Sequence, residues 1–139
     1  MGKQDVMAKI LPNGKGVWVP IDHGVTDFPC VGLENIEATI TAIIAGGANV
    51  IVAHKGVVDK YSHLCEGTAT SMIAHLSAST RHGGKNHSNK VLVGDVDEAI
   101  MRGAVGVSVQ ANIGSKKEST MLQRMGHITT EAFLNQVPV

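Results

Sequence analysis

Apolar and polar positions along this chain follow two periodicities, which predict strands separated by helices. Short, nearly continuous apolar runs are typical of strands that are buried on both faces. Such runs occupy residues 17–21, 49–54, 70–77 and 105–110. Between them, apolar residues recur at helical spacing over 32–47, 96–103 and 115–136. Gly126 marks a point at which the last of these helices can divide into two pieces.

The predicted helices carry start and stop signals. Glu34 and Glu37 lie in the first turn of the helix over 32–47, where acidic side chains complement the helix dipole. Gly103 closes the helix over 96–103. Ser115 and Glu118 have the spacing of a capping box, in which each side chain satisfies an otherwise unpaired backbone donor.

Alternation of apolar strands with helices is typical of parallel strands joined by helical crossovers. Residues 44–54 and 100–110 also align without gaps, an offset of 56 residues (44 to 100). Four such offsets approach the roughly 250 residues of a complete eight-stranded barrel. The sequence therefore predicts an α/β fold, the N-terminal half of a (β/α)8 TIM barrel with about four parallel strands, as one partial domain over 1–139. Residues 137–139 read as the beginning of a fifth strand.

A small doubly wound sheet is the competing fold. No glycine-rich dinucleotide fingerprint follows the first predicted strand, which disfavours a nucleotide-binding domain of that kind.

Composition narrows the choice of partners and compartment. Lys+Arg and Asp+Glu number 12 each and aromatics make up 3%, so we expect no nucleic-acid partner. No apolar run reaches the roughly 20 residues of a bilayer span, so we expect no membrane partner. Two cysteines, Cys30 and Cys65, fit free thiols in a reducing cytoplasm.

Polar residues follow each predicted strand. In parallel α/β folds, functional groups gather at the carboxyl ends of the strands. We therefore expect the groups that follow the four strands to share one face. These groups are Asp22–Gly24, His54–Gly56, Ser77–Thr80 and residues 110–114.

Each candidate has two interpretations. Asp22, at the mouth of an apolar strand, is either a proton acceptor or the cap of a turn in which Gly24 supplies an unusual backbone angle. Lys55 is either a Schiff-base lysine or, as we favour, a solvated lysine that opens the next loop. His54 fits a hydrogen-bonded histidine at the edge of the core better than a metal ligand.

The hydroxyls of residues 77–80 suit a polyol or carbonyl substrate, or simply begin a loop. The seven histidines show no strong metal-ligand spacing, so no metal and no cofactor is predicted.

Several motifs occur in an order that resembles the archaeal class I aldolases of the DhnA and DeoC type. They are VPIDHGV, GLENIEATI, GGANVIVAHKGVV, HLSAST, VDEAIMRGAVGVSV and NIGS. The resemblance implies a β/α barrel that forms a Schiff base between a lysine and a ketose phosphate, without a metal. It points to the branch that uses aspartate semialdehyde on a route to 3-dehydroquinate and aromatic amino acids. Archaeal fructose-bisphosphate aldolases are near kin.

The resemblance also implies residue roles. The aspartate of the family's DHG motif, the proton acceptor, corresponds to Asp22, and the substrate-contacting turn corresponds to residues 23–26. With the strand-end candidates, the predicted substrate-binding set is Asp22, His23, Gly24, Val25, Thr26, His54, Ser77, Ser79 and Asn112.

Departures from the family pattern limit this expectation. The family's tyrosine proton donor, Schiff-base lysine and phosphate-holding strands follow the position of Val139. Gln110 stands where the family usually has histidine, and Lys55 matches a family lysine that is not the nucleophile. We therefore expect these 139 residues to be inactive alone.

An open half-barrel leaves strand edges unpaired, so we expect a homo-oligomer or a complementary half-barrel as partner. A non-catalytic half-barrel that pairs with itself or such a partner is the alternative function from another class.

Overall fold

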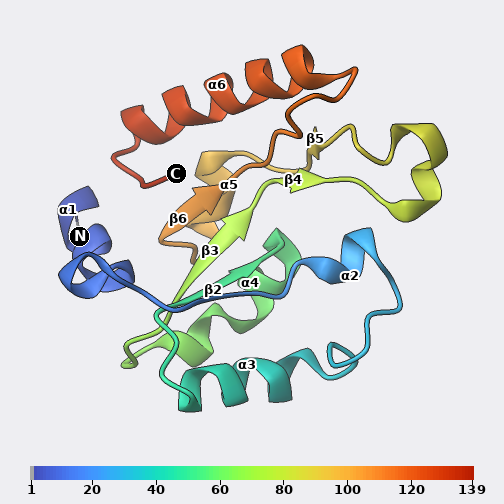
Figure 1. Ribbon diagram of the computed structural model, residues 1–139. Helices are drawn as coiled ribbons and strands as arrows, with labels where there is room; N and C mark the ends of the chain where they lie inside the picture. The colour runs from blue at the N-terminus through green and yellow to red at the C-terminus, as the bar shows by residue number, and fades with distance from the viewer. Residues whose placement is uncertain (1) are drawn as a thin grey trace.

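Four parallel strands form the central sheet of the chain. The structure is a computed structural model that describes residues 2–139. The strands are β1 (Trp18–Pro20), β2 (Val50–Ala53), β3 (Ser71–His75) and β6 (Gly106–Ser108). They are ordered β1-β2-β3-β6, and every neighbouring pair is parallel (Figure 1). The prediction of four parallel strands is confirmed. The doubly wound alternative is wrong, because the order contains no reversal that would create a switch point.

Helices connect the strands and extend beyond them. They are α1 (Lys3–Ile10), α2 (His23–Thr26), α3 (Ile36–Ala45), α4 (Lys55–Tyr61), α5 (Val96–Met101) and α6 (Glu118–Leu134), with 3-10 turns η1 (Pro12–Gly14), η2 (Ser62–Cys65) and η3 (Arg81–Asn86). A short antiparallel pair joins β4 (Ser77–Ala78) to β5 (Val91–Leu92). Figure 1 shows α1 at one end of the strands and α2 and β4 at the other.

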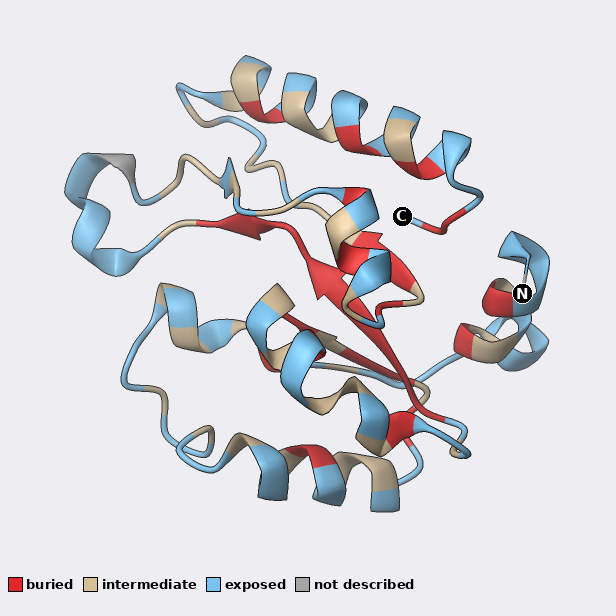
Figure 2. Ribbon diagram, turned by 180° about the vertical axis from the view of Figure 1, so that it is seen from behind, coloured by how far each residue is buried: buried red, intermediate tan, exposed pale blue. Residues whose placement is uncertain are grey.

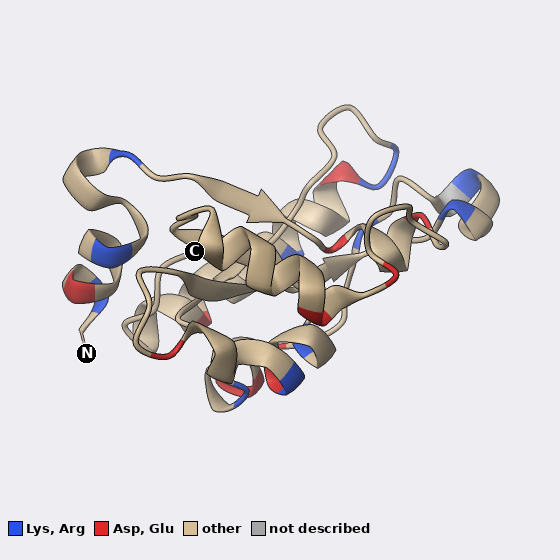
Figure 3. Cartoon of the chain, turned by 90° about the horizontal axis from the view of Figure 1, so that it is seen from below, with Lys and Arg blue, Asp and Glu red and all other residues tan. Residues whose placement is uncertain are grey.

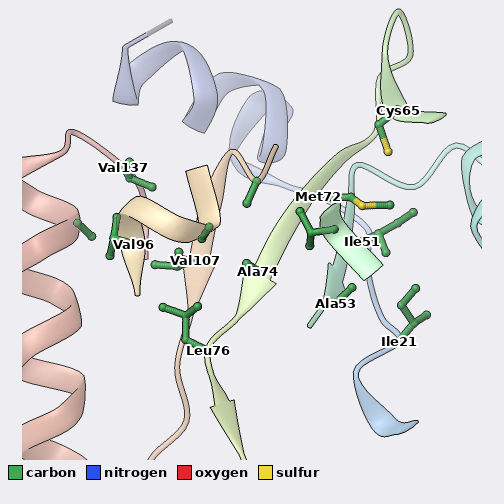
Figure 4. Packing of buried hydrophobic residues seen from close by; sticks show 14 of the residues in the cluster. Ile21, Ile51, Ala53, Cys65, Met72, Ala74, Leu76, Val96, Val107 and Val137 are labelled. Carbon is green, nitrogen blue, oxygen red and sulfur yellow. The ribbon is translucent and has the colours of Figure 1, made fainter. Parts of the chain in front are cut away.

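The main core lies between the sheet and the helices α3 to α6. Successive side chains of a strand point to opposite faces, so alternate residues of β2, β3 and β6 meet these helices. Figure 4 shows the strand side chains gathered in this layer, and Figure 2 shows the buried faces of the elements. The core contains Ile51, Ala53, Met72, Ala74 and Val107 from the strands and Ile40, Val58, Val96, Ala99, Ile128 and Ala132 from the helices.

The other face of the sheet has a smaller core under α1. Val6 and Ile10 of α1 pack on Val50 and Ile73 at the amino-terminal part of that face. α1 itself is absent from the sequence expectation, because its apolar residues are few and its neighbours are polar.

The prediction that residues 17–21 form a strand buried on both faces is wrong for β1. Val17 and Trp18 are exposed by 61% and 40%, and only Ile21 of the run is buried. β1 lies at the edge of the open sheet, so one of its sides has no neighbouring strand.

The last helix differs from expectation at its start and its middle. α6 runs unbroken through Gly126, and Lys117, not Ser115, precedes it. The capping box does not form as predicted, because the Ser115 hydroxyl accepts from the Lys117 N–H and the Glu118 carboxylate accepts from the Gly114 N–H.

Residues 137–139 form no strand, although the Val107 N–H donates to the carbonyl of Pro138 at 3.1 Å. This contact occupies the edge of β6 where a fifth strand would pair.

The repeat at an offset of 56 residues has a structural counterpart. Gly47 after α3 and Gly103 after α5 both adopt positive φ, 79° and 98°. This conformation suits glycine and ends each helix before the next strand begins.

Candidate active site

The strand register places four polar side chains in one layer. Pro20 pairs with Val52, Val52 with Ile73, and His75 with Ser108. Asp22, His54 and His75 each lie two residues beyond Pro20, Val52 and Ile73, on the same face of the sheet. These three side chains are therefore level with one another. An aspartate, two histidines and a serine therefore form a row across the carboxyl ends of the sheet, on the face opposite the helices α3 to α6.

His75 is the centre of this row. Its Nδ1 lies 2.7 Å from the hydroxyl of Ser108, and its Nε2 lies 3.7 Å from a carboxylate oxygen of Asp22. The second distance is longer than a hydrogen bond and makes the contact an electrostatic one. The residue is 8% exposed. Burial lowers the pKa of His75, while the negative charge of Asp22 opposes that shift.

His54 completes the row on β2. Its Nδ1 lies 3.0 Å from the backbone carbonyl of His75, and the two rings are 5.6 Å apart. A carbonyl oxygen only accepts, so Nδ1 of His54 carries the hydrogen. Nε2 is then a lone-pair acceptor when the ring is neutral. Burial lowers the pKa of His54, and Asp22 again opposes the shift.

Asp22 lies at the junction of β1 and α2. It precedes α2, but its side chain makes no capping hydrogen bond, and Gly24 is helical. The interpretation of Asp22 as a turn cap with an unusual Gly24 angle is therefore wrong. The Asp22 carboxylate points toward His75 and stays partly exposed, with 24% of its side chain accessible.

Two cavities open beside α2. The first, of about 290 Å³, is lined by Asp22, Gly24, Val25 and His54, and its remaining walls are largely apolar. The second, of about 270 Å³, is lined by Thr26, Ser79 and Asn112 together with basic and amide side chains. The short helix α2 contributes residues to both.

The remaining predicted site residues lie apart from these cavities. His23 is exposed at the start of α2. Ser77 is buried, and its hydroxyl accepts from the Gln110 N–H at 2.9 Å, so it joins β4 to the segment after β6. The roles proposed for the whole set remain predictions.

Lys55 differs from the favoured interpretation of its position as a solvated lysine that opens a loop. It is the first residue of α4, and its Nζ lies 3.0 Å from both carboxylate oxygens of Glu98 on α5. It therefore opens a helix instead of a loop, and it is held in an ion pair on the helical side of the molecule.

Sequence reasoning missed His75 and Ser108. The apolar runs in the sequence extend to residues 77 and 110, two positions beyond the layer that meets Asp22. Period-two alternation was the available signal, because His75 and Ser77 share a face and Ser108 shares the face of Gln110.

Among residues 2–139, no group of three or more His, Cys, Asp or Glu side chains comes together in a way that could hold a metal ion.

The parallel strands follow one another in the sheet in the order of the sequence, and a row of polar groups lies at their carboxyl ends. This arrangement is typical of the β/α-barrel class of enzymes. The model of the DeoC/LacD family of aldolases matches residues 16–139. The chain belongs to this family, and it is thereby related to enzymes.

Curated relatives agree with the family. The chain is 35% identical over 129 residues to 2-amino-3,7-dideoxy-D-threo-hept-6-ulosonate synthase 1 of Archaeoglobus fulgidus. This alignment covers 93% of the chain and 48% of that protein. It is 33% identical over 138 residues to the synthase of Halobacterium salinarum, covering 99% of this chain and 51% of that protein. The chain spans about half the length of these relatives.

Solved structures of aldolases share the fold. An archaeal fructose-1,6-bisphosphate aldolase with its catalytic lysine bound to a carbinolamine intermediate superposes with a TM-score of 0.79 at 22% identity, covering 98% of this chain and 55% of that one. A fructose-bisphosphate aldolase of Slackia heliotrinireducens superposes with a TM-score of 0.74 at 20% identity, covering 94% and 45%. The four-stranded sheet is therefore part of a β/α barrel, as predicted.

Proposed function

We propose that these 139 residues are the amino-terminal half of a class I, Schiff-base aldolase similar to 2-amino-3,7-dideoxy-D-threo-hept-6-ulosonate synthase. The substrates proposed are a ketose phosphate and aspartate semialdehyde, and the product serves aromatic amino acid biosynthesis through 3-dehydroquinate. The observation that carries the proposal is the row of Asp22, His54, His75 and Ser108 at the carboxyl ends of the strands. The family match over residues 16–139 supports it.

In this proposal, Asp22 is the proton acceptor. Cleavage of an aldol bond requires that the departing hydroxyl lose its proton while the carbon–carbon bond breaks. A carboxylate within reach of that hydroxyl takes the proton and returns it in the reverse direction. Asp22 suits this step because its oxygens make no capping bond and its carboxylate is partly exposed at the mouth of the barrel. The amine that forms the Schiff base comes from the other half of the barrel.

Borohydride trapping tests this division of labour. The 139-residue chain, incubated with a ketose phosphate and borohydride, should show no added mass by mass spectrometry. Lys55 directly follows His54 of the row in the sequence, but its ammonium is paired with the Glu98 carboxylate. A covalent adduct on Lys55 would overturn the assignment.

Complementation tests the role of Asp22. Together with the second half of the Archaeoglobus fulgidus relative, the chain should form an adduct in that second half and turn over substrate. Asp22→Asn should retain the adduct and lose turnover by about 100-fold or more, the usual effect of a lost general base. Glu66→Gln, an exposed carboxylate that lines neither cavity, is the control and should keep turnover. Equal turnover in both variants contradicts the proposal.

Fructose-bisphosphate aldolase activity is the second candidate, favoured by the fold shared with archaeal aldolases of that kind. The complemented protein distinguishes the two by its acceptor: aspartate semialdehyde for the synthase, glyceraldehyde 3-phosphate for the aldolase.

We also propose a reducing, cytoplasmic location, because Cys30 and Cys65 are both free thiols. No helix within residues 2–139 has the length and apolar character needed to cross a membrane.

A further inference from the structure

The second cavity beside α2 is lined by basic side chains without acidic ones. Its lining includes Arg81, His87 and Lys90 and no acidic side chain. The remaining lining residues carry hydroxyl or amide groups, among them Ser79 and Asn112. Figure 3 shows Lys and Arg positions, without Asp or Glu, on the η3 turn at one end of the molecule. The chain as a whole has no net charge, so this concentration of positive charge is local.

Lys90 supplies a positive charge that no acid compensates. Arg81 is partly neutralised, because it pairs with Asp27 at 3.3 Å and donates to the Phe28 carbonyl at 2.6 Å. Within residues 2–139, by contrast, no carboxylate lies within ion-pair distance of Lys90. Lys90 is half-buried, and its backbone carbonyl accepts from Arg124 of α6 at 2.6 Å. Its position is therefore fixed by α6.

The charge of Lys90 also reaches the polar row. Burial is the main cause that lowers the pKa of His54 and of His75, and the positive charge of Lys90 lowers both further. The ammonium is therefore close enough to both imidazoles for its charge to act on them.

Two polar residues of the lining add hydrogen-bonding groups to this positive charge. The hydroxyl of Ser79 is buried and has no hydrogen-bond partner among the described residues. Leaving a buried hydroxyl unpaired is costly, and a ligand that pairs with it removes that cost. The amide of Asn112 is held in place, because it donates to the Ser88 carbonyl at 2.7 Å and accepts from Gln110 at 2.8 Å.

We propose that this cavity, bounded by Ser79, Lys90 and Asn112, binds the carboxylate or phosphate group of a small substrate. The inference rests on the proposed function, since that group would belong to one of the two aldolase substrates. A volume of about 270 Å³ is below the range of drug-sized ligands and suits a small polar metabolite. A carboxylate and a phosphate present the same acceptor chemistry to an ammonium and a hydroxyl.

Binding of simple anions to the 139-residue chain tests the site. Inorganic phosphate and succinate are titrated separately, and backbone amide shifts are followed by NMR. We expect saturable shifts at Ser79, Lys90 and Asn112. Tighter binding of phosphate would indicate that the cavity holds a phosphate group, and tighter binding of succinate would indicate a carboxylate. No saturable shift with either anion, or shifts centred elsewhere, would overturn the proposal.

Variants of Lys90 separate a specific site from general attraction. Lys90→Gln should weaken the preferred anion about tenfold or more, the effect of one lost charge-assisted hydrogen bond. Lys90→Arg should restore most of the affinity. Lys116→Gln changes the net charge equally but lies in a different cavity, and it should bind like the unaltered chain. Equal weakening by Lys116→Gln contradicts the site.

A second variant keeps the test independent of folding. Ser79→Ala removes the unpaired hydroxyl without changing charge, and it should weaken binding several-fold while the amide spectrum stays folded. The result is distinct from that of the trapping experiment. If the chain binds the anion but the complemented protein shows no Schiff-base trapping, the anion site stands and the aldolase function is rejected. If trapping occurs but Lys90→Gln has no effect on anion binding, the aldolase function stands and the anion site is rejected.

Discussion

The two histidines of the polar row carry their hydrogens on different ring nitrogens. His54 must donate from Nδ1, since its partner is a carbonyl oxygen. His75 faces a carboxylate through Nε2, so the neutral ring best places its hydrogen there and accepts from the Ser108 hydroxyl at Nδ1. Ser108 thus holds the ring of His75, whose Nε2 makes an electrostatic contact with the carboxylate of Asp22.

Removal of the Asp22 charge should be visible in both histidines. Asp22 raises the pKa of His75 and of His54 against the lowering by burial, so Asp22→Asn should lower both pKa values further. NMR titration of the imidazole signals measures this. Asp27→Asn removes an acid that pairs with Arg81 instead, and it should leave both histidines unchanged. An unchanged His75 pKa in Asp22→Asn would contradict the contact.

At the scale of elements, α4 and α5 are joined by charges over the main core. Glu98 of α5 contacts Lys55 of α4 at 3.0 Å and Arg102 at 2.9 Å, and Arg102 also contacts Asp59 of α4 at 3.2 Å. These four side chains come from two successive crossovers, so the cluster holds one helix against the next.

The cluster predicts how stability depends on pH. Hydrogen bonds from Lys55 and then Arg102 lower the pKa of Glu98 below its ordinary 4.5, so folding favours the charged carboxylate. Its contribution is present above pH 4.5 and is lost as pH falls through the lowered pKa.

Glu98→Gln should therefore reduce the Tm at pH 7 and have a diminishing effect in acid, as measured by circular dichroism. Glu66→Gln, an exposed control, should match the unaltered chain at both pH values. If Glu98→Gln lowered the Tm equally at every pH, the loss would come from altered packing and not from the lost charge.

At the scale of the whole molecule, the sheet is open. β1 leaves one edge unpaired, and the inner face above α1 carries Trp18, which is 40% exposed. Unpaired strand edges and exposed apolar faces are templates for association. We therefore predict that the chain associates, with a second copy of itself or with a complementary half-barrel.

Association should follow from this open face. Size-exclusion chromatography with light scattering should show a mass that rises with concentration, and Trp18→Lys should shift the chain toward the monomer. Phe133→Lys, on α6 and 67% exposed, alters another surface and should not. A clean monomer of the unaltered chain at all concentrations would contradict this prediction.

The sequence by itself determined the order and type of the main elements. Apolar runs and helical spacing located β2, β3, β6, α3 and α5 within a few residues, because burial on a parallel sheet leaves a strong periodic signal. The strand ends also located Asp22 and His54. The helix α4 was missed, since its seven residues KGVVDKY include a glycine and two lysines.

Tertiary structure alone decided which polar residues meet. His75 and Ser108 come together through the register of β3 and β6, which pairs them across the sheet. Lys90 is held in place by a hydrogen bond from Arg124 of α6 to its backbone carbonyl. The exposure of β1 followed from its place at the sheet edge. Local sequence records how each residue suits its own element, whereas register, edges and anchoring depend on residues far away in the chain.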